Sequence, residues 1–185
     1  MLFVAAVQTL RASARYTRAI DAVAELLARL RVDAVFVGNV ARTAWLGGEV
    51  ESGTVDVLAL MAEPQKNQLA MMASNRGFRV ERDELQAADE LDLVPIGFRD
   101  DEGEVRVFVL LATNALYAKM VTSGRETMFG ERLLRVPAAE DLALMLLMAE
   151  DDGTLRSLTE LPEFDLAAFR ERLTSIGLGG RVAAE

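Results

Sequence analysis

The sequence contains no cysteine and no histidine. These absences exclude disulfides, thiolate nucleophiles, Cys/His zinc sites and every catalytic arrangement that relies on a histidine base. Any chemistry must therefore use carboxylates, hydroxyls, amides or arginine. Lysine occurs only at Lys66 and Lys119, so nearly all positive charge is arginine. That composition is a poor match for a polybasic membrane anchor.

Positive charge is scarce as a whole. The chain has 20 Lys and Arg against 29 Asp and Glu, a formal net charge of −9, which argues against a broad nucleic-acid interface because such interfaces need clustered cations. No stretch approaches the roughly 20 uninterrupted apolar residues of a membrane span. The apolar opening, residues 1–15, has no basic segment before it. We expect a cytoplasmic protein whose opening helix packs on the core.

Apolar residues are plentiful. At 185 residues with 51% hydrophobic content, the chain can form one domain with its own core. Hydrophobic spacing and glycine positions predict an amphipathic helix over 16–31, a buried strand at 35–37, a short helix over 39–46, a strand over 54–62 and a helix over 66–78.

The second half is predicted to begin with two antiparallel strands. Residues 91–113 contain two runs of β-formers around an acidic, glycine-containing turn. Residues 122–136 are polar and mixed, and we assign them no element. Helices are predicted over 137–150 and 163–181. The order predicts an α+β fold, a mixed β-sheet with flanking helices and a helical C-terminal segment. We expect an α/β core over 1–135 and that segment over 136–185.

A candidate site is centred on the turn after the first predicted strand. Gly38 and Asn39 open a helix whose backbone N–H groups can hold a phosphate. Asp56, in the apolar run "GTVDVLAL", can hold Mg²⁺ against that phosphate, although one carboxylate is a weak magnesium site. The structural alternatives are that Gly38 serves a turn with positive φ and that Asp56 is hydrogen-bonded to that turn or to an arginine.

Several segments carry a family resemblance. "VFVGNVARTAWL" followed by "TVDVLAL" resembles the strand, G-G/S-x-x-A, short helix and T-x-D-h-D-h pattern of the nucleotidyltransferase superfamily that includes DNA polymerase β. "ASNRGFRVE", "VFVLLATNALY" and "VPAAEDLALMLLMAEDDGTLRSL" are similar to later segments of its AbiEii-type branch, which is associated with toxins and antitoxins. The resemblance implies a nucleotidyltransferase-like fold. In that family three strand acids bind two magnesium ions, which align a nucleoside triphosphate.

The chain departs from this pattern at most acid positions. With Asp56 as the second acid, the first falls at Thr54, the register we prefer; with Asp56 as the first, the second falls at Leu58. The third falls at Val109, or at Phe108 if the register slips by one. Either register leaves one carboxylate.

Three other acids are candidate replacements for the missing carboxylates. Glu49 and Glu51 precede Asp56, and Glu51 starts roughly 16 Å away if the chain between them is extended. Glu104 is predicted to belong to the turn between the two later strands. None of the three is a straightforward substitute.

The sequence therefore predicts a catalytically inactive nucleotidyltransferase-like protein that acts as a nucleotide-binding or protein-interaction module. One alternative is an active enzyme that uses Mg²⁺ to move NMP from ATP or another NTP to an RNA or protein hydroxyl. Another is an oligomeric partner protein of a toxin–antitoxin-type operon. We expect no cofactor unless the site is active, in which case Mg²⁺ and an NTP are required. The implied partners are a nucleotide, another protein or a second copy of this chain. We do not expect it to bind nucleic acid or a membrane.

Several remaining side chains are given structural roles. Trp45 and four methionines are predicted to pack in the core: Met71, Met72, Met145 and Met148. Glu140 and Asp141 are predicted to favour a helix N-terminus, and Arg172 a helix C-terminus. The acidic run at 150–154 is predicted to be a solvated turn.

Overall fold

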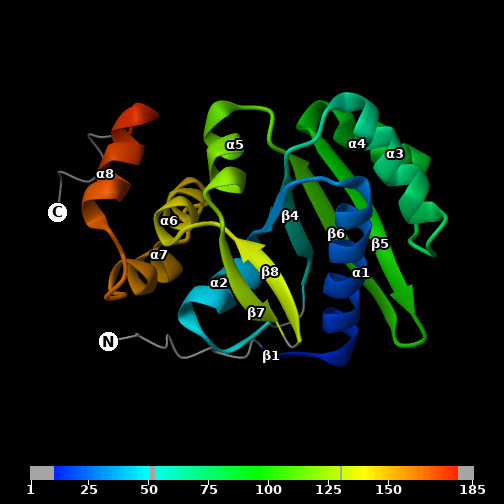
Figure 1. Cartoon of the computed structure of the whole chain (residues 1–185), viewed down its shortest axis with the longest axis horizontal. Coiled ribbons are helices and arrows are strands. Elements are labelled where there is room, and N and C mark those ends of the chain that lie inside the picture. The colour runs from blue at the N-terminus through cyan, green and yellow to red at the C-terminus, as the bar shows by residue number, and fades with distance from the viewer. Residues whose placement is uncertain (1–10, 51–52, 130, 179–185) are drawn as a thin grey trace.

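The computed structural model describes residues 11–50, 53–129 and 131–178. The opening helix predicted within residues 1–15 falls mostly on residues 1–10, which lie outside the described residues. Residues Arg11–Ala12 form strand β1, and the first described helix, α1, spans Ala14–Leu30. Helix α1 runs along the sheet in Figure 1. Ser13 caps it by accepting a hydrogen bond from the Tyr16 N–H.

The main sheet has four strands in the order β2-β4-β6-β5. Their bounds are β2 Ala34–Phe36, β4 Val55–Ala59, β5 Leu93–Asp100 and β6 Gly103–Leu111. Strand β4 pairs antiparallel with β2 and parallel with β6, and β5 and β6 form the predicted antiparallel pair. The sheet is therefore mixed, as predicted.

Two smaller pairs flank this sheet. Strand β1 pairs in parallel with β3 (Glu49–Val50), and β7 (Arg125–Phe129) forms a hairpin with β8 (Arg132–Val136). The hairpin was not predicted from the sequence. Strand β8 packs near β2, so the hairpin extends the core beyond the four-stranded sheet.

Helices surround the sheet. Their bounds are α2 Gly38–Leu46, α3 Glu63–Ser74, α4 Arg82–Ala88, α5 Ala115–Thr122, α6 Ala139–Met148, α7 Asp152–Thr159 and α8 Leu166–Ser175, with a 3₁₀ turn at Asp89–Leu91. Helices α4, α5 and α7 were not predicted. None of the helices within the described ranges is both long and apolar enough to cross a membrane.

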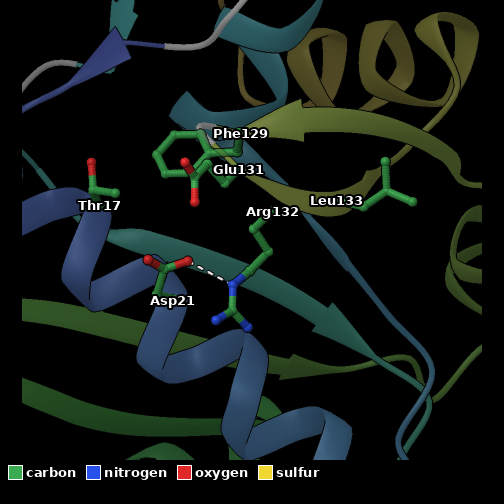
Figure 2. A pocket seen from close by; sticks show the side chains of 6 residues that line it. All are labelled: Thr17, Asp21, Phe129, Glu131, Arg132 and Leu133. Carbon is green, nitrogen blue, oxygen red and sulfur yellow. Dashed lines mark ion pairs between the residues drawn. The ribbon is translucent and has the colours of Figure 1, made fainter.

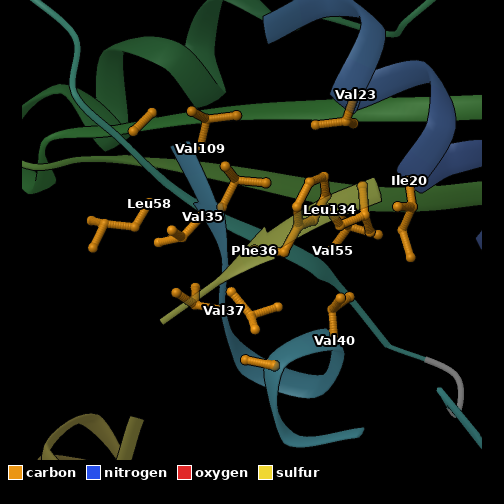
Figure 3. Packing of buried hydrophobic residues seen from close by; sticks show 14 of the residues in the cluster. Ile20, Val23, Val35, Phe36, Val37, Val40, Val55, Leu58, Val109 and Leu134 are labelled. Carbon is orange, nitrogen blue, oxygen red and sulfur yellow. The ribbon is translucent and has the colours of Figure 1, made fainter. Parts of the chain in front are cut away.

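The two faces of the sheet differ. One face lies under α1 and consists of fully buried aliphatic residues such as Val55 and Val109, which pack in the core with α1 side chains such as Val23 (Figure 3). The opposite face carries Asp56 and Phe108, which are both half-buried. Helix α5 contacts β2 and β4, yet the part of this face around Asp56 stays partly open.

A buried polar contact joins the C-terminal helices. Asp141 is 1% exposed and accepts hydrogen bonds from Nε of Arg172 on α8 (2.5 Å) and from Oγ of Ser123 after α5 (3.1 Å). Glu140 accepts from the Asp165 N–H at the start of α8 (2.9 Å). Both acids lie in the first turn of α6, as predicted. The side chains of Glu140, Asp141 and Arg172 also connect separate elements. The sequence predicted only their favourable effect on the ends of their own helices.

Trp45 of α2 connects this helix with β7 and with the segment before α6. Its indole Nε1 donates to the Pro137 carbonyl (3.0 Å) before α6, and the Arg125 guanidinium of β7 lies 3.7 Å from the centre of its ring. Met72 and Met145 pack against the core as predicted. The prediction was wrong for Met71 and Met148, which are 60% and 44% exposed. The proposed boundary between 135 and 136 stays a prediction.

Candidate functional site

Asp56 is the polar residue within the apolar strand β4. Parallel pairing places Asp56 opposite Phe108 and Val57 opposite Val109. Residues paired across neighbouring strands point to the same side of a sheet. Phe108 therefore lies with Asp56 on the face opposite α1, which we call the half-open face. Val109 lies on the fully buried face. Of the two positions proposed for a third acid, Phe108 is therefore the neighbour of Asp56.

Thr54 lies beside Asp56. Two residues apart in an extended segment, the two side chains point the same way, and the Thr54 hydroxyl donates a 3.0 Å hydrogen bond to Oδ2 of Asp56. The Thr54 carbonyl accepts a hydrogen bond from the Tyr16 hydroxyl. The predicted acid position thus carries a hydroxyl that stabilises the charge of Asp56.

The turn at Gly38 is in direct contact with the same carboxylate. Gly38 has φ +56°, and a Cβ added there would lie 2.6 Å from Oδ2 of Asp56. Glycine is required both by this positive φ and by the close approach. The Val37 N–H donates to the Asp56 carbonyl at 2.9 Å, which fixes the turn against β4. The interpretation of Gly38 as a positive-φ turn is confirmed.

Asn39 and Tyr16 complete the surroundings of Asp56. Asn39 shares a hydrogen bond with the Tyr16 phenol, and its Nδ2 lies against Gly53. Tyr16 is 3% exposed. Tyr16 was not predicted, because nothing in the helical spacing of 16–31 indicates that the first aromatic residue of this helix reaches the strand that carries Asp56.

Burial dominates the electrostatics of these groups. It raises the pKa of Asp56, while the hydrogen bond from Thr54 acts in the opposite direction. Burial, together with the charge of Asp56, raises the pKa of Tyr16 to about 12, although its hydrogen bond with Asn39 lowers it. The phenol therefore stays protonated near neutral pH and remains a hydrogen-bond donor.

Asp56 forms no ion pair within the ranges 11–50, 53–129 and 131–178. The described residues also contain no group of three or more acidic side chains placed to hold a metal ion. Glu104 lies in β6, not in the preceding turn as predicted, and pairs with Arg79 (3.2 Å) and Arg99 (3.1 Å). Glu49 is exposed in β3, and Glu51 lies outside the described residues.

The surface also has two depressions away from Asp56. One, of about 510 Å³, lies between α1 and the β7–β8 hairpin, where Asp21 pairs with Nε of Arg132 at 2.7 Å (Figure 2). The other, of about 350 Å³, lies between α2 and α7 and includes Arg42 and Ser157. The second also includes Glu49, one of the three acids named as replacements, but neither depression includes Gly38, Asn39 or Asp56.

No protein-family model matches the sequence, and no curated protein matches it. Solved structures do match the fold. An antigenic nucleotidyltransferase-like protein from Paracoccidioides brasiliensis matches with a TM-score of 0.55 and 12% identity, over 90% of this chain and 88% of its own. The antibiotic-resistance factor ANT(2'')-Ia matches with a TM-score of 0.56 and 15% identity, over 90% and 97% of the two chains.

A third match is the lincosamide antibiotic adenylyltransferase LnuA bound to lincomycin, with a TM-score of 0.50 and 10% identity, over 77% of this chain and 96% of the other. At these identities the likeness concerns the fold alone. The chain has a nucleotidyltransferase-like fold, as the sequence resemblance implied.

Proposed function

We propose that this chain is a nucleotidyltransferase-fold protein that does not transfer nucleotides and acts by binding, as a nucleotide-binding or protein-interaction module. The observation that carries the proposal is the pair of residues beside Asp56. Thr54 precedes it on the same face, and Phe108 lies opposite it across the ladder. A hydroxyl and an aromatic ring stand where an active site would need further carboxylates.

The expected loss of rate follows from the chemistry of phosphoryl transfer. Two bound metal ions align the triphosphate and neutralise charge that develops in the transition state. A single half-buried carboxylate does not supply enough anionic ligands for two Mg²⁺ ions. Removal of this electrostatic stabilisation costs many powers of ten in rate.

The contact with Gly38 also weakens the case for a triphosphate at this turn. The first turn of α2 favours anions, but Oδ2 of Asp56 already lies against Gly38. A phosphate placed there would meet a like charge without a bridging cation. The resemblance to the AbiEii-type branch, a cytoplasmic location and a toxin–antitoxin setting are further parts of the proposal, supported by the sequence alone.

The first test combines binding and transfer. We expect that isothermal titration with ATP and CTP detects no Mg²⁺-dependent binding, and that α-labelled nucleotides transfer no label to the protein or to added RNA. The same titrations on Asp56→Ala serve as the control. Label transfer by the wild type would overturn the proposal in favour of an active enzyme, whereas Mg²⁺-dependent binding that this substitution abolishes would show that Asp56 still holds a metal-bound nucleotide.

A second test restores the acids. The double variant Thr54→Asp, Phe108→Asp places three carboxylates around one point of the half-open face. We expect its melting temperature to rise in Mg²⁺ relative to EDTA, because the metal relieves repulsion among the acids. The matched control is Thr54→Asp, Val109→Asp, which introduces one acid into the core and should be strongly destabilised with no such rise. An equal Mg²⁺ effect on the wild type would contradict the proposed loss of the site.

A further inference from the structure

Phe108 is an aromatic residue that does not pack in the hydrophobic core. It lies in the middle of β6, an interior strand of the sheet, between the fully buried Val107 and Val109. Its own side chain is half-buried, and it belongs neither to the core cluster nor to the partly buried hydrophobic residues that pack against that cluster. Part of an aromatic surface thus faces outward from the sheet.

Its neighbour Asp56 is a carboxylate without a cation among the residues that the structure describes. Oδ2 is held by Thr54, whereas Oδ1 accepts no hydrogen bond from any described residue. The Asp56 side chain as a whole is half-buried. A half-buried carboxylate is costly when no positive group compensates it.

The arginines near this face are already paired. Arg106 lies two residues before Phe108 and contacts Glu84 at 3.2 Å. Arg99 on β5 contacts Glu104 at 3.1 Å. These guanidinium groups have carboxylate partners of their own. Asp56 is therefore the acid on this part of the described face that has no positively charged partner.

The Phe108 ring and the Asp56 carboxylate together suit the binding of an arginine side chain. Asp56 and Phe108 are paired in the register of β4 and β6, and paired strands lie about 4.8 Å apart, so the two residues are neighbours on one face of the sheet. A guanidinium is planar, stacks on aromatic faces and donates to carboxylates through a fork of N–H groups. We infer that Asp56 and Phe108 receive an arginine side chain of a basic protein partner. The inference rests on the proposed function, since it assigns to binding the face that an enzyme would use for metals.

A protein partner is favoured over a small molecule. The site lies on a partly open sheet face and lines neither of the depressions of about 510 and 350 Å³ described above, whereas small ligands generally need an enclosing pocket. The net charge of −9 attracts basic surfaces and speeds their association. Arginine is also among the residues that contribute most to protein interfaces.

The test uses a short peptide of alternating arginine and glycine, with a lysine–glycine peptide as comparator, in EDTA and without nucleotide. We expect saturable shifts of the backbone NMR signals at 54–58 and 106–110 with the arginine peptide and binding several-fold weaker with the lysine peptide. Asp56→Asn should weaken binding by roughly 10- to 150-fold, because a charge-assisted hydrogen bond is lost. Phe108→Leu should weaken it by roughly 2- to 30-fold, and Phe108→Tyr should retain it.

The matched control is Asp101→Asn, which removes the same charge from an exposed turn between β5 and β6 and should leave affinity unchanged. Equal affinity for the wild type, Asp56→Asn and Phe108→Leu would overturn the inference, since the peptide would then be responding to net charge alone. Absence of binding, or ATP in EDTA shifting the same signals in place of the peptide, would also overturn it. Failure of the proposed function is seen separately, as label transfer in the presence of Mg²⁺.

Discussion

Two aspartates in this molecule show how differently a fold can treat a carboxylate. Asp141 is 1% exposed at the contact of α6 with α8, and it has both a guanidinium partner, Arg172, and a hydroxyl donor, Ser123. Asp56 is half-buried in β4 and has one hydroxyl donor, Thr54, and no cation within the described part of the chain. The more deeply buried acid is thus the one with the more complete set of partners.

The difference separates a structural role from a binding role. A buried charge that serves folding has its countercharge in the same chain, because an uncompensated charge in the interior is expensive. Among the described residues Asp56 lacks that countercharge, and its side chain is only half-buried. We therefore expect its partner to lie outside the described residues. Three substitutions break or sharpen this comparison.

The largest effect is expected at Asp141. Arg172→Met leaves this carboxylate buried without its cation and should lower the free energy of unfolding by about 3–5 kcal/mol. Urea denaturation at neutral pH measures the change. Arg170→Met, which removes the same charge from an exposed position on α8, should change stability by less than about 0.5 kcal/mol. Similar losses in the two variants would mean that the Asp141 pair contributes nothing special.

An intermediate effect is expected at the turn against Asp56. Gly38→Ala introduces a Cβ at φ +56°, at 2.6 Å from Oδ2 of Asp56, and should cost about 2 kcal/mol from backbone strain and steric overlap. In an Asp56→Ala background the overlap is gone, and the cost should fall to about 1 kcal/mol. Thermal denaturation of the four proteins in this cycle gives the coupling. A cost that is the same in both backgrounds would show that the carboxylate does not press on the turn.

The smallest effect is expected from Asp56→Asn, which should stabilise the protein by less than about 1 kcal/mol at neutral pH, because no ion pair is lost and a buried charge is removed. Burial raises the folded-state pKa of Asp56 above its ordinary value of 3.8. As pH falls through the folded pKa towards 3.8, the folded wild type takes up a proton before the unfolded chain does and gains stability relative to the variant.

The advantage of the Asn variant should therefore be complete above the folded pKa and shrink towards pH 3.8. Denaturation of both proteins between pH 7 and 4 measures it, since other titrating groups cancel in the difference. An advantage that grows on acidification would mean that a cation stabilises Asp56 in the folded chain.

The sheet and its central turn were predictable because their signals are local. A β-branched and aromatic run ended by Gly38 predicted β2, an apolar run closed by Pro64 predicted β4, and two runs of β-formers around an acidic turn predicted β5 and β6. Helix α7 was missed because Asp151 was interpreted as part of a solvated turn, whereas its Oδ1 accepts the Thr154 N–H and caps the helix. The β7–β8 hairpin was missed because its charged, half-exposed residues do not alternate clearly.

The candidate site was predictable only in part. Some of its contacts join residues far apart in the sequence, and others depend on the register of strand pairing. That Thr54 and Asp56 share a face is predictable, because residues two apart in a strand point to the same side. The choice between Phe108 and Val109 depended on pairing with another strand, where a slip of one residue exchanges the faces. Tyr16 comes from a helix 38 residues before Thr54, and no local pattern connects the two.

Trp45 gives the molecule an optical reporter. It is the single tryptophan of the chain, so its fluorescence has one source. Its indole is bonded to the Pro137 carbonyl and stacked under Arg125, at the junction where the chain enters α6. If the last three helices separate from the sheet before the rest unfolds, the emission spectrum will shift ahead of the far-ultraviolet circular dichroism, and coincident curves will mean that the whole chain unfolds as one cooperative unit.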